Sequence, residues 1–410
     1  MLAAQVYASM RFLFYSHDGV GLGHVRRHIA IASALVAALP EAKILLATGV
    51  DEAPHLGLPP NIDILKLPGL RKVANNQYEA RRLGLDMAEI RGLRSGLLKS
   101  AVESFRPGVV LVDKHPFGVG GEFRAALEAA KAAGARTALG LRDILDTPST
   151  VLREWSEEGV RDRIAEYYDR VLIYGQQSIY DPVQQYQFSP ALAERTQFCG
   201  YVLNQAPCAW RNDPCAMLMP AQAVKHRLVL ATTGGGEDGF ELLRTFIEAA
   251  NGAPWEAALV AGPMLAPEEF KELQELGRQR VKIHSFVPCL PEVFESVDAL
   301  VCMGGYNTLV EAVCQGVPTV CIPRAWPRRE QVLRAQAFER LGLLRSLDSA
   351  TLGVEPLRRE IMAALSLPRK QVAERARATL QVDGAQNAAD QLAALFSNGR
   401  DRGKVVLTGP

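Results

Sequence analysis

Three glycine-containing loops each stand between an apolar strand-like run and a helix-like run, an arrangement suited to binding anions. The first loop, HDGVGLGHVRRHIA (17–30), contains Gly21, Gly23 and His24. The free N–H groups and positive dipole end of the following helix favour a phosphate, and glycine lets the backbone approach closely. His24 occupies the position where the dinucleotide fingerprint G-x-G-x-x-G requires Gly or Ala, so the loop is not an NAD-binding motif.

His24 is the candidate general base. The positive end of a helix keeps an imidazole at its first turn neutral, and a neutral imidazole can accept a proton near pH 7. The alternative is that His24 is only a polar residue that caps the helix in a surface loop. Spacing alone does not choose between the two interpretations.

The other two loops lie in the second half of the chain. The second contains Gly234, Gly235 and Gly236 and follows the apolar run 227–233. The third is MGGYNTLVEA (303–312), which contains Gly304, Gly305, Asn307, Thr308 and Glu311. Either loop could hold a diphosphate, with Glu311 accepting hydrogen bonds from a ribose. The alternatives are a tight turn for the second loop and, for the third, a capping box made by Thr308-x-x-Glu311.

Charged residues follow several other strand-like runs. Arg324, Glu330 and Gln331 lie after the run 318–323, where an arginine can bind phosphate and the other two can bind sugar hydroxyls. The alternative is a solvated start of a helix. In the first half, acceptor contacts are expected from Asp113, His115 and Arg142, together with Gly21 and Gly23. For Arg142 the alternative is local ion pairing with Asp143.

Apolar strand-like runs alternate with amphipathic helix-like runs along the chain. Continuous Val, Ile and Leu runs predict strands that are buried on both faces of a parallel sheet, so the order indicates doubly wound α/β sheets. The predicted strands are 11–16, 43–48, 109–113, 136–141, 170–175, 227–233, 256–262, 282–286, 299–303 and 318–323.

The pattern restarts at about residue 227, after a segment rich in Pro and Asn that is typical of a linker. The sequence therefore predicts two Rossmann-like domains. The predicted boundaries are 1–204 for the first domain, 205–222 for the linker, 223–368 for the second domain, 369–398 for a C-terminal helix with a break near Gly384, and 399–410 for a loose tail.

Composition excludes several classes of protein. The 410 residues include 46 Lys plus Arg against 45 Asp plus Glu, so nucleic acid is not the expected main partner. No apolar run reaches the roughly 18–20 residues that span a bilayer. The first residues predict a short tail and a strand rather than a signal peptide. Seven scattered cysteines without a C-x-x-C pair predict a reducing, cytoplasmic compartment.

The second half resembles a known family. HSFVP (284–288), GGYNTLVEAVCQGVPTVCIPR (304–324) and EQVLRAQAFERLGL (330–343) resemble the C-terminal domain of glycosyltransferase family 28. In the first half, VLVDKHPFGVGGE (110–122) and LRDILDTP (141–148) resemble a bacterial branch of predicted glycosyltransferases. The resemblance implies a GT-B fold of two facing Rossmann-like domains, with a nucleotide-sugar donor in the second and a hydroxyl acceptor in the first. It also implies a UDP-sugar donor, inversion at the anomeric carbon, and neither a metal nor another cofactor.

The resemblance also assigns roles to particular residues. The glycines 234–236, Gly304, Gly305 and Thr308 would surround the diphosphate, and Phe286 and Val287 would meet the base. Glu311 would bind ribose, Glu330 and Gln331 the donor sugar, and His24 would lie in the cleft between the domains. The C-terminal helix would cross back to the first domain.

Other classes remain open. A nucleotide-sugar epimerase or a non-catalytic sugar-nucleotide binding protein could use the same frame. A nicotinamide oxidoreductase is the weakest alternative, because His24 breaks the dinucleotide fingerprint. The acceptor is not defined by the sequence: a small molecule, a lipid or a glycan are all compatible with it. Residues 69–106 carry eight basic and four acidic groups with interleaved Leu and Met, which fits either peripheral contact with the inner face of a membrane or a solvated helical face.

Overall fold

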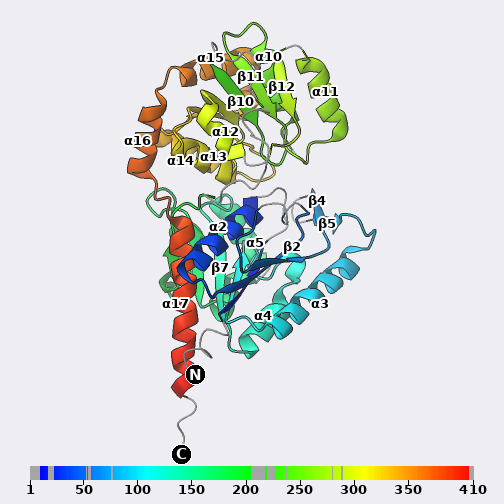
Figure 1. Ribbon diagram of the computed structural model, residues 1–410, viewed down its shortest axis with the longest axis vertical. Helices are drawn as coiled ribbons and strands as arrows, with labels where there is room; N and C mark the ends of the chain where they lie inside the picture. The colour runs from blue at the N-terminus through cyan, green and yellow to red at the C-terminus, as the bar shows by residue number, and fades with distance from the viewer. Residues whose placement is uncertain are drawn as a thin grey trace, which may run out of the picture. The chain divides into compact units, whose positions relative to one another are not determined.

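The chain forms two compact units, which are described separately. In the computed structural model, unit 1 comprises Met1–Pro207 and Gln381–Pro410, and unit 2 comprises Cys208–Leu380 (Figure 1). The residues that the structure describes are 10–16, 23–51, 53, 57–74, 77–157, 159–204, 218, 227–236, 238–278, 280–287 and 290–405. The predicted linker 205–222 therefore lies, apart from Leu218, outside the described residues.

Unit 1 is built on a seven-stranded parallel sheet. In pairing order its strands are β3 (Ile62–Lys66), β2 (Lys43–Thr48), β1 (Arg11–Tyr15), β6 (Val109–Asp113), β7 (Arg136–Arg142), β8 (Arg170–Tyr174) and β9 (Thr196–Phe198). A short antiparallel hairpin of β4 (Leu70–Ala74) and β5 (Gln77–Ala80) follows β3. The helical segments are α2 (Gly23–Ala38), α3 (Met87–Phe105), η2 (Val119–Gly121), α4 (Arg124–Ala132), α5 (Pro148–Glu157), α6 (Val160–Tyr167), α7 (Pro182–Gln185), α8 (Pro190–Glu194) and α17 (Gly384–Val405).

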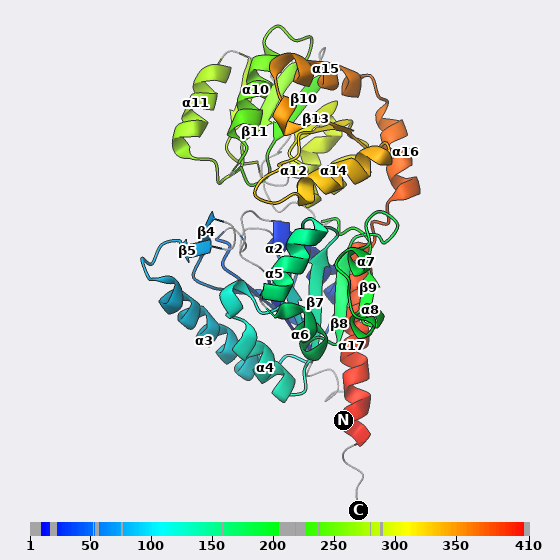
Figure 2. The same cartoon turned by 180° about the vertical axis from the view of Figure 1, so that it is seen from behind.

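Two side chains of β1 that point to opposite faces show that this sheet is covered on both sides. Phe12 contacts Phe396 of α17, with ring centroids 5.5 Å apart, while Tyr15 contacts Phe123 on the other face, with centroids 4.8 Å apart. In Figures 1 and 2, α2 and α17 lie side by side, and so do α3 and α4. Because both faces are buried, the strand contains no polar alternation, as the sequence predicts.

Unit 2 repeats this design with a six-stranded parallel sheet. Its strands in pairing order are β12 (Val281–His284), β11 (Glu256–Val260), β10 (Leu228–Thr232), β13 (Ala299–Cys302), β14 (Thr319–Cys321) and β15 (Arg345–Ser346). Its helical segments are α10 (Phe240–Ala250), α11 (Pro267–Gly277), α12 (Leu290–Val293), η3 (Phe294–Ser296), α13 (Tyr306–Cys314), α14 (Glu330–Arg340), η4 (Ser349–Thr351), α15 (Val354–Leu365) and α16 (Arg369–Thr379). The α/β class with two doubly wound sheets is thus confirmed.

The C-terminal segment predicted as a helix over 369–398, with a break near Gly384, forms two helices. These are α16 in unit 2 and α17 in unit 1, and the break between them pairs with the segment that follows β9, through an antiparallel bridge between Val202 and Asp383. The Tyr201 N–H donates to the Gln381 carbonyl at 2.7 Å, and a Cβ on Gly200 would meet that same carbonyl oxygen at 2.7 Å. Close approach of two backbones therefore requires glycine here. Helix α17 continues to Val405, so the tail predicted from 399 is helical at its start.

A buried ion pair attaches α3 to the core of unit 1. Arg94 donates from Nε and Nη2 to the two carboxylate oxygens of Glu122, both at 2.7 Å, and Tyr15 Oη donates to the same carboxylate at 2.6 Å. Both ionic side chains are almost completely buried. A bidentate pair of this kind depends on both partners, because a lone buried charge is costly.

We predict that Glu122→Gln lowers the free energy of unfolding of unit 1 by about 3–5 kcal/mol, because it leaves the Arg94 guanidinium buried without its counter-ion. Urea unfolding followed by circular dichroism measures this. Glu79→Gln is the matched control, since it breaks the exposed Arg71–Glu79 pair and should have little effect. Equal shifts for the two variants would contradict the prediction.

Candidate active site

The topology of unit 1 brings His24 to Asp113. His24 lies in the first turn of α2, and Asp113 ends β6, the neighbour of β1. The Nδ1 atom of His24 is in hydrogen-bond contact with Asp113 Oδ2, although 89 positions separate the two residues. The histidine side chain is 9% exposed and the aspartate side chain is fully buried. The sequence placed both residues in the first domain but did not pair them.

Arg27, one turn along α2, completes this arrangement. Its Nη2 donates to Asp113 Oδ1 at 2.9 Å and lies 2.9 Å from His24 Nδ1. An ionised carboxylate can only accept a hydrogen bond, and a guanidinium can only donate one. The hydrogen on Nδ1 is therefore the one that His24 donates to Asp113. The assigned tautomer has hydrogen on Nδ1 and a lone pair on Nε2, which is the form that a general base requires.

The charges of this group are fixed by burial and by its neighbours. Burial lowers the pKa of His24 to about 3; Asp113 opposes this shift, while Arg27 and Arg142 add to it. Burial would raise the pKa of Asp113, but Arg27 and His24 outweigh burial and hold that pKa well below its usual range. The pair is therefore a neutral imidazole on a carboxylate at neutral pH.

A second histidine of α2 is packed beneath the pair. His28 is fully buried, its ring lies edge-on to Phe14 with centroids 5.4 Å apart, and its Nε2 is 3.9 Å from Asp113 Oδ1. Neither ring nitrogen has a hydrogen-bond partner among the described residues. Burial lowers the pKa of His28 to about 4, so this ring is also neutral at pH 7. His28 was not predicted as a site residue, and its only local signal is its place four residues after His24.

The remaining predicted acceptor residues lie at the same edge of the sheet. Arg142 ends β7, and Arg27 packs over the ring of Tyr174, which ends β8, with 5.1 Å from Cζ to the ring centroid. His115 follows Asp113, and its N–H donates to the Asp113 carbonyl at 2.7 Å. Gly23 begins α2, whereas Gly21 lies outside the described residues. Contact of these residues with an acceptor stays a prediction.

In unit 2 the glycines 234–236 have a packing role. A Cβ on Gly236 would lie 2.7 Å from the Ala261 carbonyl oxygen, and a Cβ on Gly262 would lie 2.5 Å from that of Gly234. Both glycines also have positive φ, at 98° and 97°. Glycine is therefore required where the loops after β10 and β11 meet. This supports the tight-turn interpretation and leaves diphosphate binding as a prediction.

Helix α13 begins differently from the capping box that the sequence offered. Gly305 is the N-cap residue, no side chain caps the helix, and Thr308 lies inside the first turn. The capping-box alternative was wrong because glycine ends the loop before Thr308 is reached. The N–H groups and positive dipole end at the start of a helix suit an anion. Glu311 is 6% exposed, and its contact with a ribose stays a prediction, as does the contact of Asn307 with the diphosphate.

The loop between β14 and α14 is held by ion pairs within unit 2. Arg324 donates to Asp238 Oδ2 at 2.7 Å and to Glu330 Oε1 at 3.1 Å, so carboxylates already neutralise the charge that was predicted to meet a phosphate. Gln331 Oε1 accepts the backbone N–H of Arg324 at 3.1 Å. In this conformation Arg324 and Gln331 shape the loop. Contacts of Arg324, Glu330 and Gln331 with a donor sugar stay predictions.

Arg334 of α14 was not predicted as a site residue. It is fully buried in α14, donates to the Gly304 carbonyl oxygen at 3.1 Å, and its Cζ lies 5.6 Å from the ring centroid of Tyr306. A buried cation therefore lies directly behind the loop that starts α13. The only sequence signal was a charged residue at a core-facing position of a helix.

Phe286 and Val287 follow β12 at the same edge of the unit 2 sheet. Phe286 is 39% exposed and Val287 is buried. An exposed aromatic ring at this edge could stack on a base, and this role stays a prediction.

The basic segment 69–106 is largely paired with acidic groups. Arg82 lies 3.0 Å and Arg81 3.6 Å from Asp51, Lys99 lies 3.7 Å from Glu103, and Arg94 is the buried partner of Glu122. Leu83, Leu93 and Leu97 are exposed on this part of unit 1. Contact with a lipid surface stays a prediction. No helix within the described part of the chain combines the length and apolarity needed to cross a bilayer.

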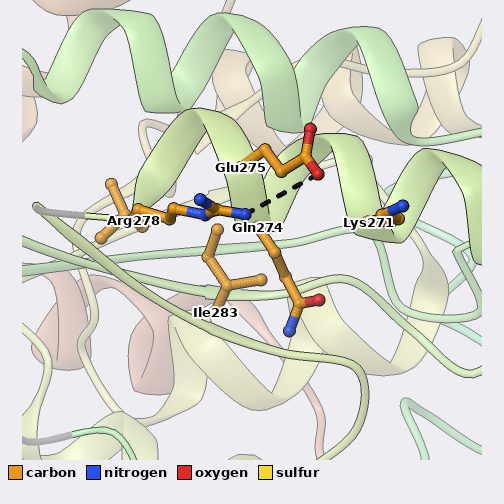
Figure 3. Close-up of a pocket in the computed structure, with 6 residues that line it drawn as sticks. Lys271, Gln274, Glu275, Arg278 and Ile283 are labelled. Atoms are coloured by element: carbon orange, nitrogen blue, oxygen red, sulfur yellow. Dashed lines mark ion pairs between the residues drawn. The ribbon is translucent and has the colours of Figure 1, made fainter.

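A surface hollow of unit 2 lies apart from the glycine loops. It is formed by α11 and β12, and Figure 3 shows Lys271, Gln274, Glu275, Arg278 and Ile283 around it. Arg278 and Glu275 lie 3.7 Å apart in it, as exposed neighbours on one helix end. It contains none of the residues predicted to bind a donor or acceptor, and we assign it no function.

Comparison with solved structures defines the class of fold. The glycosyltransferase SnogD from Streptomyces nogalater is similar with a TM-score of 0.63 and 20% identity over 94% of this chain and 100% of that one. MurG from Acinetobacter baumannii is similar with a TM-score of 0.58 and 14% identity over 94% and 99%. The chain therefore has the GT-B fold.

Comparison with sequences defines the family of the second half. Residues 235–392 match the family model of the glycosyltransferase family 28 C-terminal domain, so the predicted resemblance is confirmed. The NDP-glycosyltransferase YjiC of Bacillus licheniformis is 28% identical over 159 residues, which are 38% of each chain. A UDP-N-acetylglucosamine--N-acetylmuramyl-(pentapeptide) pyrophosphoryl-undecaprenol N-acetylglucosamine transferase of Vibrio vulnificus is 28% identical over 190 residues, 45% of this chain and 54% of that one. The chain thus spans about half or less of the curated relatives that it matches.

The lowered histidine pKa values predict how the stability of unit 1 depends on pH. Between about pH 4 and 6.5, an unfolded chain protonates His24 and His28 whereas the folded chain does not. The free energy of unfolding should therefore fall as the pH falls below 6.5, by up to about 1.4 kcal/mol per pH unit for each histidine. Urea titrations at pH 7, 6 and 5 measure the slope.

His28→Phe supplies the control for this prediction. It removes one of the two titrating groups and fills a similar volume beside Phe14, so the slope should fall by about half. A stability that does not change between pH 6.5 and 5, or an unchanged slope in the variant, would contradict the assigned neutral histidines.

Proposed function

We propose that the protein is an inverting glycosyltransferase that moves a sugar from a nucleoside-diphosphate sugar, a UDP-sugar, to a hydroxyl group of an acceptor. The observation that carries the proposal is the buried His24–Asp113 contact at the carboxyl edge of the unit 1 sheet. The GT-B fold and the family 28 domain support it. Ligands of open α/β sheets bind at this edge, outside the carboxyl ends of the strands.

His24 would act as the general base. Its Nε2 accepts the proton of the acceptor hydroxyl as that oxygen bonds to the anomeric carbon, while the bond from that carbon to the diphosphate oxygen breaks. Attack from the face opposite the leaving group inverts the configuration. Asp113 keeps the imidazole in the required tautomer and stabilises the imidazolium that forms. Arg27 keeps Asp113 ionised while it does so.

The leaving diphosphate would be stabilised by unit 2. The N–H groups at the start of α13 and its positive dipole end offer fixed partial charges, and Arg334 adds a full positive charge behind them. Fixed groups of this kind need no reorganisation when negative charge develops. The contribution of unit 2 is therefore expected to be made without a divalent metal.

We predict that His24→Ala lowers turnover roughly 10²–10⁴-fold while UDP binding to unit 2 is retained. Asp113→Asn should cause a loss in the same range, because an amide can hold the wrong tautomer. Initial rates with a UDP-sugar and an acceptor measure this, and calorimetry with UDP checks that unit 2 is intact. Unchanged turnover in His24→Ala would remove this residue from the mechanism.

The same assay separates the competing functions. A transferase gives a glycosylated product only when acceptor is present, an epimerase converts the donor without acceptor, and a binding protein gives no product at all. Either of the last two results would contradict transfer.

We also predict that EDTA leaves the rate unchanged, since backbone N–H groups and Arg334 are expected to stabilise the diphosphate. Initial rates with EDTA, and with EDTA followed by excess Mg²⁺, provide the measurement. Activity that is lost in EDTA and restored by Mg²⁺ would contradict the metal-independent account.

A further inference from the structure

Trp326 is unusually exposed for a tryptophan. Its side chain is 81% exposed, more than any other large hydrophobic residue in the described part of the chain. Tryptophan normally buries most of its surface, because its ring is the largest apolar group a protein has. Within the described residues the exposed large hydrophobics include one other aromatic, Phe286, and both lie in loops at the carboxyl edge of the unit 2 sheet.

The loop that carries Trp326 is anchored on both sides of it. Before it, the Arg324 side chain donates hydrogen bonds to Asp238 and Glu330. The Arg324 backbone N–H donates to Gln331 Oε1. After it, Arg328 is buried. The loop therefore holds the indole out from the surface as part of a fixed structure, which is how a binding residue is presented.

This loop adjoins the loop that starts α13. Strands β13 and β14 pair with Cys302 opposite Cys321, so the loops that follow them are neighbours. A Cβ on Gly304 would lie 3.4 Å from Gln331 Cβ, and Arg334 of the same helix donates to the Gly304 carbonyl. The loop that carries the indole is thus the neighbour of the proposed diphosphate site, to which the donor sugar is attached.

We propose that Trp326 is a specificity-determining residue that packs against the C–H face of the donor's hexose ring. The inference rests on the proposed function. A pyranose presents several C–H groups on one face, and burying that face against an indole removes apolar surface from water on both sides. The indole N–H can donate to a sugar hydroxyl at the ring edge. The nucleotide part of the donor has no part in this contact.

Matched variants and matched ligands test this. Calorimetry would compare UDP with UDP-glucose, UDP-galactose and UDP-N-acetylglucosamine on the wild-type protein, Trp326→Ala and Trp326→Phe. We expect Trp326→Ala to weaken at least one UDP-hexose about tenfold while the affinity for UDP changes less than about twofold. Trp326→Phe should recover most of the loss, and Met362→Ala, at another exposed apolar side chain of unit 2, should change neither affinity.

Fluorescence gives a second measurement. The emission of Trp326, obtained as the difference between the wild-type protein and Trp326→Phe, should shift to shorter wavelength with the UDP-hexose and not with UDP. Equal changes in affinity for UDP and UDP-hexoses in Trp326→Ala, or no change for any of them, would overturn the inference. Absence of UDP binding to the wild-type protein would contradict the proposed function itself, and the inference with it.

Discussion

The contact between the imidazole of His24 and the carboxylate of Asp113 is the interaction on which the site of unit 1 depends. A fully buried carboxylate is costly unless it is paired, and here Arg27 and the Nδ1–H of His24 satisfy it. The same contact fixes which nitrogen of His24 carries the hydrogen. The contact between His24 and Asp113 thus both stabilises the fold and leaves a lone pair on Nε2 of His24.

The fold makes this contact by placing the end of β6 beside the end of β1. Tyr15 pairs with Val112, so the residues that follow them emerge at one edge, and α2 returns His24 to it. Helix α17, from the end of the chain, packs against α2 and against Phe12. Helix α2, which carries His24, is therefore held in place by residues from both ends of the sequence.

Much of the frame could be predicted from the sequence, because buried parallel strands are continuous apolar runs. The strands that were missed have a physical explanation: β3 is a partly exposed edge strand, β4 and β5 form a separate short hairpin, and β9 and β15 have three and two residues. His24 could be recognised from its place at a helix start. Its partner could not, since pairing over 89 positions leaves no local pattern. Arg27 and Arg334 were missed because a buried arginine looks like a solvated one in sequence. Arg324 was singled out, but its pairing with Asp238 and Glu330 was not foreseen, because these partners are set by the fold.

The tautomer and charge of His24 are what the account most directly depends on. Nitrogen-15 NMR of the histidine-labelled protein, with His24→Gln to assign the signals, reports both. The account predicts a neutral ring with hydrogen on Nδ1 that does not titrate between pH 8 and 5. A ring with hydrogen on Nε2, or one that becomes imidazolium near pH 6.5, would contradict it.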